Sequence, residues 1–243
     1  MNFKQHPLSH SVILHLFPGL VGTVVYVVLA PKLMANGYPA LLGMLVAAAA
    51  VILPLLLGIL LYQAQKTSRS FSLRAVIGYR EPLPKWQYGV IPLGLVIWGF
   101  LANGITAILD QAIAQAWFAW LPEWFFILDL AQFAAYARPA LLLTFFVGLV
   151  VNGIALPLVE ELYFRGYLLP RLARFGKWAP LINLSLFSLY HFWAPAQLLS
   201  RIVWMLPWVY LTWYKRNIYL LVITHCAANT LGWLLTWGLI LGG

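Results

Sequence analysis

Long apolar runs, separated by short polar gaps, dominate the pattern along this 243-residue chain. Because a helix needs about 20 apolar residues to cross the hydrocarbon core of a bilayer, each run predicts a transmembrane helix. The fourth run is unusually long, and the fifth is short enough to be tilted or shielded by its neighbours. The seven predicted spans cover roughly residues 11–30, 40–63, 88–110, 139–169, 179–193, 197–214 and 217–241.

Two longer gaps interrupt this pattern. The segment Gln65–Trp86 is polar and basic, which predicts a cytoplasmic loop with a short surface helix around Phe71–Ile77. The segment Gln111–Ala137 is rich in Trp and Phe and is broken by Pro122. Aromatic residues gather at membrane interfaces, so this segment predicts one or two interfacial helices, or a short eighth span.

Composition supports a membrane protein. Hydrophobic residues make up 63% of the chain and charged residues only 9%, whereas soluble domains are about half apolar and a quarter charged. We therefore expect an all-α polytopic membrane protein, a bundle of about seven to eight transmembrane helices with a buried polar cavity. The chain is expected to form a single membrane domain over residues 1–243. Its single cysteine excludes an intramolecular disulfide and a cysteine-based metal cage.

The formal net charge of +9 predicts membrane orientation and not nucleic-acid binding, because the basic residues lie in the short gaps. With the N-terminus inside, 12 of the 15 Lys and Arg residues fall on the inner side. Only Lys32, Arg138 and Arg201 fall on the outer side. The positive-inside rule thus predicts an inner N-terminus and an outer C-terminus. The expected location is a prokaryotic cytoplasmic membrane, with the lipid bilayer as the surrounding partner.

A few polar side chains lie inside the predicted spans. The stretch LVEELYFRG, residues 158–166, places two of the six acidic residues side by side at the end of an apolar run. Ionisable groups at membrane depth are costly and usually functional. The candidates are Glu160, Glu161, Arg165, His191, His225 and Asn229, with Asn103, Asn152 and Asn183 as lesser polar sites.

Three of these residues are predicted to lie at one depth. Glu160 lies about 16 Å along a helix from the basic residue Arg171, counted at 1.5 Å per residue. By the same count, His191 lies about 21 Å from Lys177, and His225 about 14 Å from its nearest basic residue. Because the three come from different spans, the sequence predicts one buried polar site in the middle layer.

Helical spacing assigns partners within the stretch at residues 158–166. Glu161 and Arg165 are four residues apart and can form an ion pair on one helix. Glu160 lies about 100° around the helix from Glu161. One carboxylate can therefore face a cavity while the other is held by Arg165.

Two further pairs share the spacing of four residues. Phe187 precedes His191 by one turn, and His225 precedes Asn229 by one turn, so each pair can face one spot. Cys226 points about 100° away from His225, which favours a packing role for the thiol.

In order along the chain, the motifs are EELYFR at residues 160–165, FSLYH at 187–191 and HCAAN at 225–229. Together they resemble the CPBP intramembrane proteases, also called the Abi or CAAX prenyl protease type 2-like family. The resemblance covers roughly residues 139–241, the motif-bearing protease core. It implies an intramembrane endopeptidase that hydrolyses peptide bonds of a membrane-associated peptide or protein.

The resemblance also implies roles for the individual residues. Glu160 and His191 would hold and deprotonate a water, while His225 and Asn229 would stabilise the oxyanion. No cofactor is expected on this reading, because Asn229 suits an oxyanion donor better than a metal ligand. The supporting residues would be Glu161, Arg165 and Phe187.

Several other interpretations stay open from the sequence. Two histidines and a carboxylate, here Glu160, His191 and His225, could instead hold a catalytic zinc ion. Without catalysis, the protein could be a membrane immunity factor or a partner in peptide processing. The same polar residues could also form interhelical hydrogen bonds or a proton relay. A transporter is less favoured because the chain shows no internal repeat.

Overall fold

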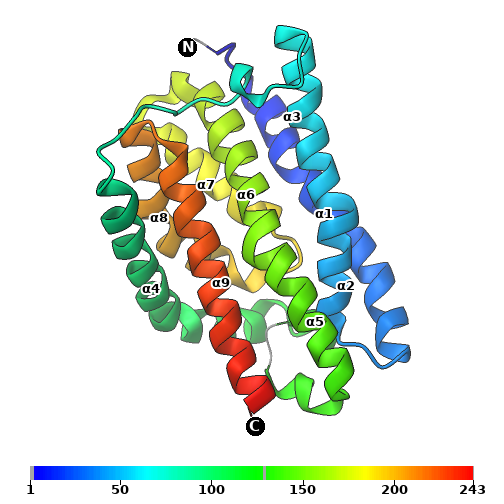
Figure 1. Cartoon of the computed structure of the whole chain (residues 1–243). Helices are drawn as coiled ribbons and strands as arrows, with labels where there is room; N and C mark the ends of the chain where they lie inside the picture. Colours follow the sequence, from blue (N-terminus) through cyan, green and yellow to red (C-terminus); the bar gives the residue numbers. More distant parts are fainter. Residues whose placement is uncertain (1–2, 128–129, 243) are drawn as a thin grey trace.

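The computed structural model describes residues 3–127 and 130–242, and its regular structure is helical throughout (Figure 1). The predicted all-α polytopic class is confirmed. The α-helices are α1 (Leu8–Ala35), α2 (Ala40–Ala47), α3 (Leu53–Ser68), α4 (Gln87–Trp117), α5 (Arg138–Val150), α6 (Leu156–Glu160), α7 (Ala179–Tyr190), α8 (Leu198–Lys215) and α9 (Ile218–Gly242).

Shorter π and 3₁₀ segments connect or extend these helices. Three of them are π-helical: η1 (Ala48–Ile52), η5 (Val151–Ala155) and η6 (Glu161–Leu168). The others are the 3₁₀ segments η2 (Leu73–Ala75), η3 (Glu123–Phe125), η4 (Leu130–Ala135), η7 (Leu169–Trp178) and η8 (Pro195–Gln197).

Five segments of the described chain are long and apolar enough to cross a membrane, instead of the predicted seven or eight. They are Leu8–Ala35, Ala40–Ser68, Gln87–Trp117, Arg138–Tyr190 and Ile218–Gly242.

The difference arises at the predicted fifth and sixth spans. Helix α7 has only 12 residues, about 18 Å of helix, which is too short to cross the hydrocarbon core. Helix α8 runs back beside it and is not among the five segments. The possible eighth span within residues 111–137 is also not supported, because the described part after α4 holds only the two short segments η3 and η4.

The predicted fourth span is one long, irregular helix. From Arg138 to Leu168, α-helical and π-helical turns follow one another without a break. The π-helical turns shift the register of the side chains, and such turns are frequent at functional sites. Glu160 ends the α-helical stretch α6 and Glu161 begins η6, so both carboxylates stand where the helix changes its winding.

The linker after α3 packs against the bundle more closely than predicted. A 3₁₀ turn occupies residues 73–75 of the expected surface helix, but Val76 and Ile77 beyond it are buried. Backbone hydrogen bonds attach this segment to the bundle, from Gly78 N–H to the Gly166 carbonyl and from Ile218 N–H to the Tyr79 carbonyl. The segment therefore fixes the C-terminal part of η6 and the start of α9 relative to each other.

Glycines allow close contact between helices that carry the site. A Cβ atom added at Gly19 of α1 would overlap the backbone carbonyl of Tyr190 at the end of α7. A Cβ atom at Gly148 of α5 would overlap the indole of Trp233 on α9. Small residues at such crossings are typical of packing inside membranes, where they let backbones approach.

Candidate active site

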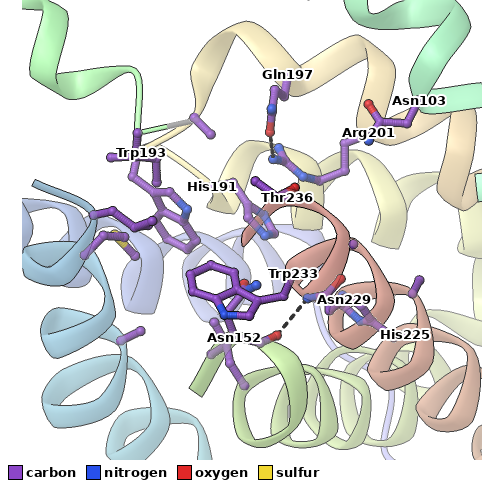
Figure 2. A pocket seen from close by; sticks show the side chains of 18 of the residues that line it. Asn103, Asn152, His191, Trp193, Gln197, Arg201, His225, Asn229, Trp233 and Thr236 are labelled. Carbon is purple, nitrogen blue, oxygen red and sulfur yellow. Dashed lines mark hydrogen bonds between the residues drawn. The ribbon is translucent and has the colours of Figure 1, made fainter. Parts of the chain in front are cut away.

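One cavity of about 310 Å³ collects the residues that the sequence singled out. Helices α2, α4, α8 and α9, the α6 end and the loop after α7 all contribute to its wall. Figure 2 shows His191 facing this cavity from the α7 side, and His225 and Asn229 facing it from α9. The predicted site residues that line it are Glu160, His191, His225 and Asn229.

Glu160 is the carboxylate that faces the cavity. Its side chain is buried at 2% exposure, and its Oε1 atom has no hydrogen-bond partner among the described residues. The hydroxyl of Tyr190 interacts with it electrostatically, yet lies outside hydrogen-bonding geometry. Glu160 therefore keeps an acceptor oxygen for a reactant.

Glu161 points away from the cavity into a buried ion cluster. Its Oε1 atom accepts hydrogen bonds from Arg165 Nη1 at 3.2 Å and from His225 Nδ1 at 2.7 Å. The Glu161 and Arg165 side chains are both fully buried. The predicted division of the two carboxylates is confirmed, but Glu161 also holds His225, a contact that spacing along one helix did not reveal.

The guanidinium of Arg165 also packs on aromatic surface. Its Cζ atom lies 3.9 Å from the ring centroid of Phe187, within cation–π distance. The ring of Phe187 also contacts the imidazole of His191, with ring centroids 4.7 Å apart. Phe187 therefore contacts both Arg165 of the ion cluster and His191 of the cavity, although it does not line the cavity itself.

The protonation of His191 follows from its hydrogen bond. Its Nδ1 atom lies 2.8 Å from the carbonyl oxygen of Phe187, and a carbonyl oxygen can only accept. Nδ1 therefore carries the hydrogen, which leaves the lone pair of the neutral ring on Nε2. In the same way, His225 Nδ1 donates to the Glu161 carboxylate.

Asn229 is held by a backbone group of the neighbouring helix. Its Nδ2 atom donates to the carbonyl of Asn152 at 3.0 Å, shown as a dashed line in Figure 2. An amide nitrogen has two N–H groups, so a second donor remains. The carbonyl of Asn152 belongs to the π-helical stretch η5. A π-helical turn of the long helix therefore supplies the acceptor that holds Asn229.

The lesser polar candidates divide between the cavity and the core. Asn103 and Asn152 line the cavity. Asn183 is fully buried elsewhere, where its Nδ2 atom contacts His15 Nε2 at 2.9 Å and the Phe164 carbonyl at 2.9 Å. Cys226 does not line the cavity, in agreement with the packing role predicted for it.

Sequence reasoning missed Arg201. It was counted as an outer loop residue, but its side chain is buried at 6% exposure and lines the cavity. Its Nη2 atom donates to Gln197 Oε1 at 2.9 Å. The spacing of Gln197 and Arg201, four residues apart on a helix, was the available signal.

The arrangement of donor groups bears on the zinc alternative. Within residues 3–127 and 130–242, no three or more His, Cys, Asp and Glu side chains are placed to hold a metal ion. Glu160, His191 and His225 thus share the cavity without forming a ligand set. The expectation that the site works without a cofactor stays a prediction.

Comparison with known proteins agrees with this site. Residues 139–231 match the family described as Type II CAAX prenyl endopeptidase Rce1-like. The matched family is one of proteases, and the match covers less than half of the chain. The match confirms the resemblance drawn from the three motifs, all of which lie within it. The chain matches no curated protein and no solved structure. Together, the family match and the five long apolar segments indicate an integral membrane protein.

Proposed function

We propose that this protein is an intramembrane endopeptidase that uses Glu160 as the general base and no metal. The observation that carries the proposal is the cavity itself, where Glu160, His191, His225 and Asn229 meet from three separate helical segments. Its substrate is a peptide bond of a membrane-associated peptide or protein.

Water activation uses the two groups that have free acceptors. Glu160 Oε1 takes a proton from water, and His191 Nε2 orients that water through its lone pair. The resulting hydroxide attacks the carbonyl carbon of the peptide bond. Glu160 then passes its proton to the amide nitrogen, the C–N bond breaks, and an acid and an amine leave. A positioned base of this kind typically contributes 10²–10⁴-fold to the rate.

Oxyanion stabilisation comes from the α9 side of the cavity. The second N–H of Asn229 is one donor. The other is His225 Nε2, provided that this ring carries a proton on both nitrogens. The Glu161 carboxylate lies 2.7 Å from Nδ1 of the same ring, where it would be the counter-ion of that form. Each such donor is typically worth roughly 10²–10³-fold in kcat.

Replacement of Glu160 tests the proposal. We expect Glu160→Gln to lower cleavage of a membrane-derived peptide library by about 10²-fold or more, because the amide cannot accept the water proton. His191→Ala should also lose activity. The matched control is Glu81→Gln, since Glu81 is an exposed carboxylate on the linker.

The control measurements separate the alternatives. Unchanged cleavage by folded Glu160→Gln protein would contradict the assignment of the base. If no peptide is cleaved by the parent while an immunity phenotype survives Glu160→Gln, the protein is a non-catalytic partner factor. Zinc analysis of the purified parent decides the metal question, because stoichiometric zinc lost on replacing His191 and His225 would overturn the metal-free scheme.

A further inference from the structure

Arg201 is a buried cation that the proposed chemistry does not use. Arg201 lies near the N-terminal end of α8, and its side chain lines the same cavity as Glu160 and His191. Figure 2 shows Arg201 beside Gln197, to which its side chain donates a hydrogen bond. A positive charge at this depth is costly and calls for a partner.

The guanidinium is incompletely paired. One of its five N–H donors is used by Gln197, while the Nη1 atom is buried with no hydrogen-bond partner among the described residues. In the part of the chain that the structure describes, Arg201 forms no salt bridge. Its charge interacts with Glu160 and Asp110 only at longer range. Desolvated donors without a partner cost free energy unless a ligand completes them.

Arg165 provides the comparison within the same molecule. Both arginines are buried, but Arg165 has a carboxylate partner in Glu161 and an aromatic face in Phe187. Arg165 therefore stabilises the helix from inside the protein. Each arginine leaves one buried nitrogen without a hydrogen-bond partner among the described residues, Nε in Arg165 and Nη1 in Arg201. Of the two, only Arg201 lines the cavity and, within the described chain, has no carboxylate in a salt bridge with it, which is the arrangement of a binding group.

We propose that Arg201 forms an anion subsite that binds a carboxylate of the substrate. Guanidinium and carboxylate match in shape and charge and can share two parallel hydrogen bonds. Arg201 is thus a specificity-determining residue, and this inference rests on the proposed function. The carboxylate is either the C-terminus of a peptide chain or an Asp or Glu side chain, and the experiment distinguishes these sources.

Binding to an inactive variant tests the subsite without needing turnover. The full-length Glu160→Gln protein, purified in detergent, is titrated into fluorophore-labelled apolar hexapeptides and followed by fluorescence polarisation. One pair of peptides differs only in a C-terminal carboxylate or amide. A second, amidated pair differs only in one internal Asp or Asn.

We expect tighter binding of the carboxylate member in one of the two pairs, by about tenfold or more. The preferred pair identifies the source of the carboxylate. In Arg201→Gln that preference should disappear, while the affinity for the neutral peptide stays the same. Arg201→Lys should keep part of the preference, because it retains the charge without the planar fork. The control is Arg174→Gln, which removes an exposed charge.

Two results would overturn the subsite. One is equal affinity for charged and neutral peptides in the parent background, a comparison that needs no Arg201 variant. The other is an equal loss of affinity for the charged and the neutral peptide in folded Arg201→Gln protein, which would assign Arg201 a structural role. Cleavage by the parent is measured separately, so a protein that binds selectively but never cleaves would contradict the proposed function and leave the subsite standing.

Discussion

At the scale of single residues, the site divides its charges between a buried cluster and an open cavity. Glu161 accepts hydrogen bonds from both Arg165 and His225, whereas Glu160 faces the cavity with an Oε1 atom that has no hydrogen-bond partner among the described residues. Adjacent carboxylates can take different roles because successive helical residues point about 100° apart. The ion cluster orients His225, and the cavity holds the reacting groups.

The Arg165 ion pair leads to a stability prediction. We expect Arg165→Ala to lower the free energy of unfolding by about 3–5 kcal/mol, because Glu161 would keep only His225 as a partner in the core. Thermal unfolding of the purified protein in detergent measures the change. Arg174→Ala removes an exposed arginine and should leave the transition unchanged. Equal midpoints for Arg165→Ala and the parent would show that the buried pair does not stabilise the fold.

At the scale of elements, the site depends on how short and irregular helices are held. Helix α7 ends in mid-bundle at Tyr190, and His191 begins the loop that follows. Its position is set by α1, which crosses it at Gly19. The carboxylates depend on the long helix from α5 to η6, where changes of winding select which side chain faces the cavity.

The α1–α7 crossing can be tested with a single methyl group. We expect Gly19→Ala to destabilise the protein by roughly 1–3 kcal/mol, because the new Cβ would overlap the Tyr190 carbonyl. It should also reduce cleavage, since a shift of about 1 Å at the neighbouring His191 can cost 10²-fold.

Thermal unfolding and peptide cleavage measure the two effects of Gly19→Ala. The control is Gly58→Ala on α3, where an added Cβ meets no atom within 4 Å. That change should be neutral or slightly stabilising. If both alanine variants behave like the parent, close approach at Gly19 is not needed to position α7.

At the scale of the whole molecule, the basic residues gather toward one end of the bundle. The termini lie at opposite ends of the bundle (Figure 1). Arg165 and Arg201 are buried inside the protein and no longer count as loop charges. Without them, eleven basic residues remain on the N-terminal side and two, Lys32 and Arg138, on the other.

This asymmetry predicts that the N-terminal end of the bundle faces the cytoplasm. A C-terminal alkaline phosphatase fusion should therefore be active in bacterial cells, while a C-terminal green fluorescent protein fusion should be dark. Exchanging the two reporters at the N-terminus serves as the control. A fluorescent C-terminal fusion would mean that the orientation is reversed.

The sequence by itself determined the class of protein, the long apolar spans and the residues that meet in the cavity. These features follow from local rules, because hydropathy selects lipid-facing helices and a spacing of four residues places Glu161 beside Arg165. The motifs also sufficed to identify the protease family over residues 139–231.

Only the tertiary structure decided the contacts between distant segments. The pairing of His225 with Glu161 joins residues 64 positions apart, and the bond between Asn229 and Asn152 joins residues 77 apart. The short reach of α7 and the inward position of Arg201 also depend on packing against other helices, which a pattern along one helix does not contain. Apolar spacing reports which face of a helix is buried, whereas the partner on that face is set by the helix that packs there.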